Sequence, residues 1–275
     1  MSVLQNKIDY ALILRIKNAN PNGDPLNGNR PRTDYEGLGE ITDVCLKRKI
    51  RDRLMEGGHS IFVQSDDRKN DDATSLRNRV QLTLGSDIFK KTPEDAKNTV
   101  CAEWFDVRAF GQVFAYKGEK KGEGVSLPIR GPVTIQSAFS IEPVFVTSTQ
   151  ITKSVSGEGD GTTRGSDTMG MKHRVDEGIY VTYGSMNPQL AERTGFSDDD
   201  AEAIKKVLPR LFENDASTAR PEGSMEVVKL IWWKHSSKAG KYSSAKVHRS
   251  LSVNSDGTFS LAELDGLKAE PIDGF

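Results

Sequence analysis

The strongest pattern in the chain is an alternation of apolar and polar residues close to its beginning. The apolar positions are Ile8, Tyr10, Leu12, Leu14 and Ile16. A period of two residues is typical of a β-strand that buries one face. We therefore predict a strand over residues 8–17 with one face in the core.

Two later segments show the same alternation and are expected to bury their apolar faces. Their apolar residues are Val133, Ile135, Phe139 and Ile141 in the first segment, and Ile179, Val181 and Tyr183 in the second. If these two strands pair, residues 147–178 form a long protruding hairpin. A connection of this length with few core residues is typically functional or disordered. A fourth strand over residues 225–233 is apolar on both faces, which indicates a central position.

Two helices are predicted between these strands. The first begins near residues 40–42, ends at Gly57-Gly58, and has a narrow apolar stripe. That stripe consists of Leu46, Ile50 and Leu54. The second begins at Ser197, with Asp200 at the capping-box position. Its apolar residues recur at helical spacing and are Ala201, Ile204, Val207, Leu208, Leu211 and Phe212.

Residues 59–100 interrupt the pattern with few periodic apolar positions, which favours an inserted subdomain. An aromatic segment follows, and we expect most of it in the core. Arg108 lies within that segment, where a charge needs a partner. Without the insertions the order of elements is βαββαβ. This order predicts an α+β fold of the ferredoxin-like or RNA-recognition-motif type.

The composition excludes a uniformly basic nucleic-acid-binding protein, because the 275 residues carry a net charge of -1. The charge is uneven, however. Six Lys/Arg residues face one acid in residues 224–250, and nine face six in residues 15–53. Such local basic faces are consistent with nucleic-acid binding or with ordinary surface variation. Residues 190–223 hold five basic and eight acidic residues, and the family resemblance described below makes this acidic segment a candidate for a partner surface.

Cysteine usage and hydropathy give no sign of a metal site or a membrane. Cys45 and Cys101 are far apart, with no histidine at zinc-ligand spacing. We therefore predict no metal and no cofactor. No signal peptide or membrane-spanning stretch is evident, so we expect a cytoplasmic location without membrane partners.

The loop of residues 18–32 is dense in Asn, Gly and Pro and leads into the first helix. That helix carries Lys47, Arg48 and Arg51, which either hold phosphates or form a solvated surface. Asp24 in the loop is a candidate for metal-dependent RNA cleavage. Gly-Asp-Pro is also an ordinary turn signal, and we favour that explanation. Met and His side chains of the predicted hairpin are suited to wedge between bases or stack beneath one.

Four motifs occur together in an order that resembles a known family. They are Asn20-Pro21-Asn22-Gly23-Asp24-Pro25 with Asn29-Arg30-Pro31-Arg32, Cys45-Leu46-Lys47-Arg48 with Arg51, Asp106-Val107-Arg108-Ala109-Phe110-Gly111, and Arg130-Gly131-Pro132-Val133. Together they resemble the CRISPR-associated protein seven family, and in particular its type I-C branch. The resemblance extends over about residues 3–233.

This resemblance implies a non-catalytic backbone subunit of a Cascade surveillance complex. Family members polymerise along a CRISPR guide RNA into a helical filament and present the guide to target DNA. The implied partners are therefore guide RNA, target DNA through the guide, further copies of the chain and other Cascade subunits. The alternative is a metal-dependent endoribonuclease of the same superfamily that uses Asp24. A small-molecule enzyme or a purely structural protein is a third class.

The family is shaped like a hand. The resemblance implies a palm made of residues 1–58, 126–146 and 179–275, the last including the C-terminal tail. Residues 59–125 would form the inserted finger subdomain with its connection back to the palm, and residues 147–178 the thumb hairpin. The residues expected to bind RNA are Asn18, Asn20, Arg30, Arg32, Lys47, Arg48, Arg51, Arg108, Arg130, Lys153, Met169, Met171, Lys172, His173 and Arg174.

Overall fold

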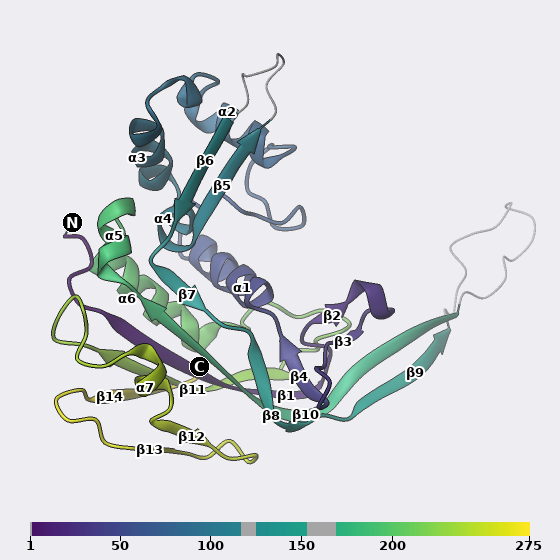
Figure 1. Cartoon of the computed structure of the whole chain (residues 1–275). Helices are drawn as coiled ribbons and strands as arrows, with labels where there is room; N and C mark the ends of the chain where they lie inside the picture. The colour runs from purple at the N-terminus through teal and green to yellow at the C-terminus, as the bar shows by residue number, and fades with distance from the viewer. Residues whose placement is uncertain (1, 117–124, 153–168) are drawn as a thin grey trace, which may run out of the picture.

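The chain folds around one large antiparallel β-sheet. The computed structural model describes residues 2–116, 125–152 and 169–275. The eight strands of this sheet are β1 (Ile8–Ala19), β4 (Leu38–Ile41), β7 (Val133–Ile135), β8 (Ala138–Pro143), β9 (Val146–Thr152), β10 (Met169–Met186), β11 (Met225–Lys234) and β14 (Ala269–Asp273). Their order is β14-β11-β1-β10-β8-β4, and β7 and β9 also pair with β10 (Figure 1).

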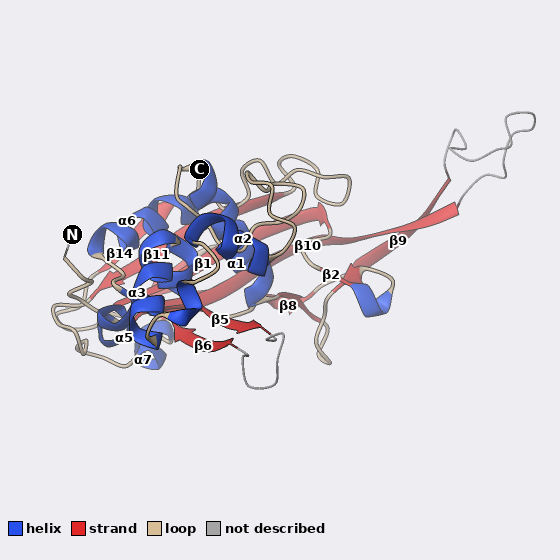
Figure 2. Cartoon of the chain, turned by 90° about the horizontal axis from the view of Figure 1, so that it is seen from above, coloured by secondary structure: helices blue, strands red, loops and turns tan. Residues whose placement is uncertain are grey.

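Helices α1 (Asp43–Glu56) and α6 (Asp198–Val207) cover one face of the sheet (Figure 2). Leu46, Ile50 and Leu54 of α1 are fully buried there, as their spacing predicts. Both helix starts are also confirmed. The Thr42 side chain caps α1, and the predicted capping box is present at the start of α6.

The other face of the sheet is covered over β11 and β1 by a C-terminal layer. This layer contains α7 (Ser244–His248), β12 (Leu251–Val253) and β13 (Phe259–Leu261) (Figure 1). Ala11 of β1 packs against it together with Trp233 and Val247. Residues 8–14 are therefore buried on both faces, and the prediction of one buried face is wrong here. The supposed polar face includes Ala11 and Ile13, whose small or apolar side chains suit a second core.

The predicted strand over residues 133–141 is divided into β7 and β8. β7 buries Val133 and Ile135 as expected. The alternation changes phase at residues 136–137, between the two strands. Phe139 and Ile141 of β8 consequently face outward and are 40% and 37% exposed. The prediction that these two side chains lie in the core is therefore wrong.

Residues 59–116 and 125–130 form a lobe with a hydrophobic core of its own. Its elements are α2 (Leu76–Leu84), η2 (Ile88–Lys90), α3 (Pro93–Glu103), α4 (Phe105–Phe110), and the hairpin of β5 (Gly111–Tyr116) and β6 (Val125–Arg130). Phe62 lies at the centre of this core, 4.7 Å from the ring of Trp104 and 5.1 Å from that of Phe114. The aromatic segment is therefore mostly core, as expected.

The predicted hairpin is confirmed in the described residues. β9 and β10 pair without interruption from Val146 and Val175 to Thr152 and Met169. This hairpin extends away from the rest of the molecule (Figure 1). Residues 153–168 of the predicted hairpin lie outside the described residues.

Short elements complete the fold. They are β2 (Gly23–Asp24), η1 (Pro25–Asn27), β3 (Arg30–Pro31), α5 (Pro188–Thr194) and η3 (Leu208–Arg210). Cys45 and Cys101 are both free thiols. Among the helices of the described ranges, none has both the length and the apolar character needed to cross a membrane.

Candidate nucleic-acid interface

The loop of residues 18–32 has a defined shape. β2 and β3 pair across it, with Gly23 opposite Pro31. Asn18 and Asn29 adopt positive φ angles of 55° and 59°, which asparagine tolerates better than most residues. At Gly23, a Cβ atom would lie 2.0 Å from Oδ1 of Asn29, so a larger residue would displace the Asn29 side chain. The density of Asn, Gly and Pro therefore encodes a specific series of turns.

Hydrogen bonds fix this loop to the start of α1. The backbone N–H and the hydroxyl of Thr42 both donate to Oδ1 of Asn22, at 2.9 Å and 2.8 Å. Asn20 is buried, and its Nδ2 donates to the carbonyl oxygen of Asn29 at 2.7 Å. Oδ1 of Asn20 has no partner in the described residues. Asn20 thus acts on the loop's shape, and its predicted contact with RNA stays a prediction.

The three candidate cations of α1 all form ion pairs. Lys47 lies 2.9 Å from Asp43, and Arg48 lies 3.1 Å from Asp52. Nε of Arg51 lies 2.9 Å from Asp106. The Arg51 side chain is only 12% exposed, compared with 26% for Lys47 and 33% for Arg48. Arg51 is therefore chiefly a link between α1 and the lobe of residues 59–116 and 125–130.

Two further cations of α1 bind the acidic segment of the same chain. Lys49 pairs with Asp215, and Arg53 donates to the carbonyl oxygen of Glu213. Both cations are buried. The charge of Asp215 in the acidic segment is thus neutralised within the chain, which sequence reasoning had not foreseen. The predicted contact of this segment with a protein partner stays a prediction.

Arg108 has the partner that its aromatic surroundings required. Its Nε and Nη2 lie 3.0 Å and 2.8 Å from the two carboxylate oxygens of Asp200. Its guanidinium also lies 4.7 Å from the centre of the Phe105 ring. This bidentate pair connects α4 to the start of α6. The predicted contact of Arg108 with RNA stays a prediction.

Three candidate cations remain available for an anionic ligand. Arg30 on β3 and Arg130 at the end of β6 are exposed, and Lys172 on β10 is half-buried. None of the three side chains pairs with a carboxylate among the residues that the structure describes. These residues come from the loop, the lobe and the hairpin, so the free positive charge is distributed over three parts of the chain.

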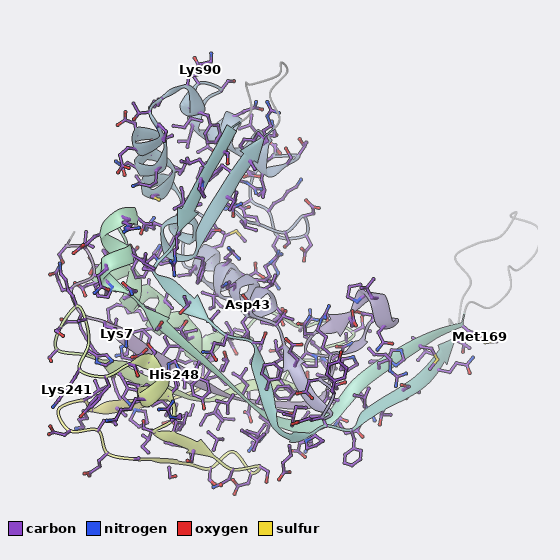
Figure 3. All side chains as sticks on the ribbon, in the orientation of Figure 1. Lys7, Asp43, Lys90, Met169, Lys241 and His248 are labelled. Atoms are coloured by element: carbon purple, nitrogen blue, oxygen red, sulfur yellow. The ribbon has the colours of Figure 1, made fainter. Side chains whose placement is uncertain are left out.

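The hairpin presents Met169, which is 67% exposed and lies at its far end (Figure 3), and Met171, which is 55% exposed. Nδ1 of His173 is hydrogen-bonded to the Ser148 hydroxyl at 2.8 Å. Arg174 lies 3.6 Å from Asp176 near the base of the hairpin. Lys153, which was also predicted to bind RNA, lies outside the described residues.

Asp24 is occupied by local contacts. Its Oδ1 accepts the backbone N–H of Leu26 at 3.2 Å and lies 3.4 Å from Nη2 of Arg32. These contacts cap η1 and fix the end of β3. In the part of the chain that the structure describes, no three His, Cys, Asp or Glu side chains are grouped to hold a metal ion.

A buried polar cluster far from the loop escaped the sequence analysis, since its members are distant in the chain. Nε2 of His235 lies 2.8 Å from Asp9, and Nδ1 of His235 accepts the backbone N–H of Lys241. His235 therefore donates from Nε2. Burial raises the pKa of Asp9, but hydrogen bonds from His235, Ser244 and Lys7 outweigh it and leave this pKa below its ordinary value.

Comparison with known proteins identifies the family. The family model described as CRISPR-associated protein Cas7 matches residues 6–268. A CRISPR-associated protein Cas7 from Haloferax volcanii is 30% identical over 230 residues, which cover 78% of this chain and 66% of the relative. The chain therefore belongs to the CRISPR-associated protein Cas7 family.

Solved structures give weaker matches. One chain of a "CRISPR RNA-guided surveillance complex" has a TM-score of 0.45 at 18% identity, covering 92% of this chain and 77% of the other. A second, from such a complex in a pre-nicking state, has a TM-score of 0.45 at 15% identity, covering 82% and 78%. These scores are too low to establish a common fold, so the family assignment rests on the sequence matches.

Proposed function

We propose that this chain is a non-catalytic guide-RNA-binding backbone subunit of a type I CRISPR surveillance complex, and specifically of type I-C. The observation that carries the proposal is membership of the Cas7 family over residues 6–268. Several copies would line one guide RNA in the cytoplasm and present it to target DNA. Other subunits of the complex would bind the ends of this filament.

The arrangement of the main sheet supports an RNA-recognition-like palm. With β7 and β8 taken as one broken strand, the chain runs β1, α1, β8, β10, α6 and β11. These strands lie side by side in the order β11-β1-β10-β8, with both helices on one face. We assign the palm to residues 1–58, 126–146 and 179–275. Residues 59–125 would be the fingers, and residues 147–178 the thumb.

The distribution of free charge supports an interface that extends over the palm loop, the fingers and the thumb. Arg30, Arg130 and Lys172 are the cations of the candidate set best placed to contact phosphates, because no described carboxylate neutralises them. The ion-paired cations of α1 would contribute to RNA binding through their position beside the interface and through their longer-range electrostatic potential. Met169 and Met171 would meet bases or another protein, since they carry no charge.

A salt titration of RNA binding tests this interface. We expect Arg30→Ala, Arg130→Ala and Lys172→Ala each to weaken binding of single-stranded RNA regardless of its sequence. Each should also lower the slope of log K against log salt by about 0.7, the value for one lost phosphate contact on a single strand. Lys91→Ala is a matched control, because Lys91 is exposed in the fingers and pairs with no described carboxylate. Unchanged slopes in all three variants would show that the interface is elsewhere.

A further inference from the structure

The sequence contains two Asn-Gly dipeptides, and both lie in the loop of residues 18–32. They are Asn22-Gly23 and Asn27-Gly28. In such a dipeptide the backbone nitrogen of glycine can attack the side-chain amide of asparagine, because glycine has no side chain to hinder the approach. The other asparagines of the loop precede alanine, proline or arginine, whose side chain or missing N–H opposes this attack. The sequence therefore gives two candidate sites of deamidation, and the structure distinguishes them.

The side chain of Asn22 is held in place by Thr42. Oδ1 of Asn22 accepts hydrogen bonds from both the backbone N–H and the hydroxyl of Thr42. Gly23, which would supply the attacking nitrogen, belongs to β2 and lies opposite Pro31. Both hydrogen bonds must break before Cγ of Asn22 can turn towards the nitrogen of Gly23. The fold therefore protects Asn22 from the reaction.

The side chain of Asn27 is exposed and has no such support. Asn27 is the last residue of η1, and Gly28 follows it in the left-handed conformation with a φ of 59°. The adjacent Leu26 is 99% exposed. No described residue is hydrogen-bonded to the Asn27 side chain. A single short turn at the surface opens at little cost, so Asn27 can reach the geometry of attack with water at hand.

We propose that Asn27-Gly28 is a site of spontaneous deamidation and that the product binds RNA more weakly. The Gly28 nitrogen gives its proton to a solvent base and bonds to Cγ of Asn27, and Nδ2 takes up a proton and leaves as ammonia. Water then opens the cyclic imide. Cleavage between the Gly28 nitrogen and Cγ gives aspartate, and cleavage between that nitrogen and the main-chain carbonyl carbon gives isoaspartate.

Either product changes the surroundings of Arg30. Each adds a negative charge three positions before this cation, which opposes contact with phosphates. Isoaspartate also inserts Cβ into the main chain, within the turn that the Asn29 N–H closes on the carbonyl oxygen of Asp24 at 2.8 Å. Asp24 lies opposite Arg30 in the pairing of β2 with β3, so a longer turn moves Arg30. The effect on RNA binding rests on the proposed function, whereas the deamidation itself does not.

Peptide mapping tests the site. Purified protein without RNA is incubated at mildly alkaline pH, both folded and unfolded in urea. Trypsin releases residues 18–32 as one peptide, because it cuts after Lys17 and Arg32 but not between Arg30 and Pro31. Tandem mass spectrometry locates each converted asparagine in this peptide, and electron-transfer fragmentation distinguishes isoaspartate from aspartate.

In the folded protein, Asn27 should be converted at least about tenfold faster than Asn22, because two hydrogen bonds hold Asn22. In urea the two residues should react at similar rates. Conversion of Asn27 no faster than that of Asn22 in the folded protein would overturn the proposal. So would a tenfold difference that persists in urea, because the local sequence and not the fold would then explain it.

RNA binding by fresh and aged protein tests the consequence. Asn27→Gln is the matched control, since glutamine keeps the amide but must close a larger ring and therefore ages more slowly. Aged wild type should bind single-stranded RNA at least about threefold more weakly than fresh wild type, and aged Asn27→Gln should keep its fresh affinity. Asn27→Asp should reproduce the part of the loss that is due to charge. Equal losses in the two aged proteins would overturn the assignment to Asn27, as would unchanged affinity of wild type that is converted there.

The two proposals fail separately. If fresh wild type does not bind RNA, the proposed function fails. The peptide map still decides whether Asn27 is the site of deamidation, because it needs no RNA.

Discussion

At the scale of single residues, many charged side chains of the described residues pair with one another and hold the fold together. The candidate cations of α1 pair with Asp43, Asp52 and Asp106, and Arg108 pairs with Asp200. The sequence shows that these residues are basic, but pairing partners that are distant in the chain become visible only in the fold. Arg51 and Asp106, for example, are separated by 55 positions.

The Arg108–Asp200 pair predicts a stability effect. Arg108→Ala removes the bidentate partner of a buried carboxylate, so we expect the free energy of unfolding to fall by about 2–3 kcal/mol. Chemical denaturation measures this change. Arg193→Ala is the matched control, because Arg193 is exposed and pairs with no described carboxylate, and it should change stability by less than about 0.5 kcal/mol. Equal effects of the two substitutions would contradict a structural role for the pair.

We expect that Asp24 does not take part in cleavage of RNA. Incubation with RNA and a divalent metal ion should show no cleavage that depends on Asp24 when wild type and Asp24→Ala are compared. The substitution should instead cost about 1 kcal/mol of stability, because it removes the cap of η1. Cleavage by the wild type that Asp24→Ala abolishes would favour the endoribonuclease alternative.

At the scale of elements, periodicity predicted α1, α6 and the hairpin well. Leu46, Ile50 and Leu54 are spaced for one helical face, and one core receives them. Periodicity failed at β8, where Phe139 and Ile141 follow the alternation of a buried face but point to solvent. Alternation predicts that a strand has two different faces, whereas the topology of the sheet decides which face is covered. It also failed at β1, since a second layer from the C-terminal end covers Ala11.

We expect the free energy of unfolding to depend on pH, because the C-terminal layer buries a histidine. Burial lowers the pKa of His248, which stacks on Tyr183 and donates to the carbonyl of Gly184. Below about pH 6.5 the unfolded chain binds a proton at His248. In the folded chain the lowered pKa keeps this side chain neutral down to a lower pH. The free energy of unfolding should therefore fall as the pH drops from about 7 to about 5.

His248→Gln should make this fall in the free energy of unfolding shallower than in the wild type. Some dependence should remain, because burial and the nearby charge of Arg108 also lower the pKa of His59. Thermal melting across this pH range measures the effect. If His248→Gln does not alter the slope of stability against pH, the stability of the C-terminal layer does not depend on this side chain.

At the scale of the whole molecule, the chain combines a sheet-and-helix body with a projecting hairpin (Figure 1). Its net charge of -1 does not oppose contact between copies, while Arg30, Arg130 and Lys172 provide local positive charge. The motifs in the sequence were sufficient to predict the family, because their residues shape the loop and anchor α1. They did not predict which cations are free, since that depends on packing across the chain.

The central claim is that this protein holds CRISPR guide RNA. The most direct measurement is to express it with a CRISPR array, purify it at moderate salt, and sequence the RNA that remains bound. We predict a high ratio of absorbance at 260 nm to 280 nm, together with RNA that contains repeat and spacer sequences. Protein that emerges free of RNA, or with RNA that shows no enrichment of the array, would contradict the account.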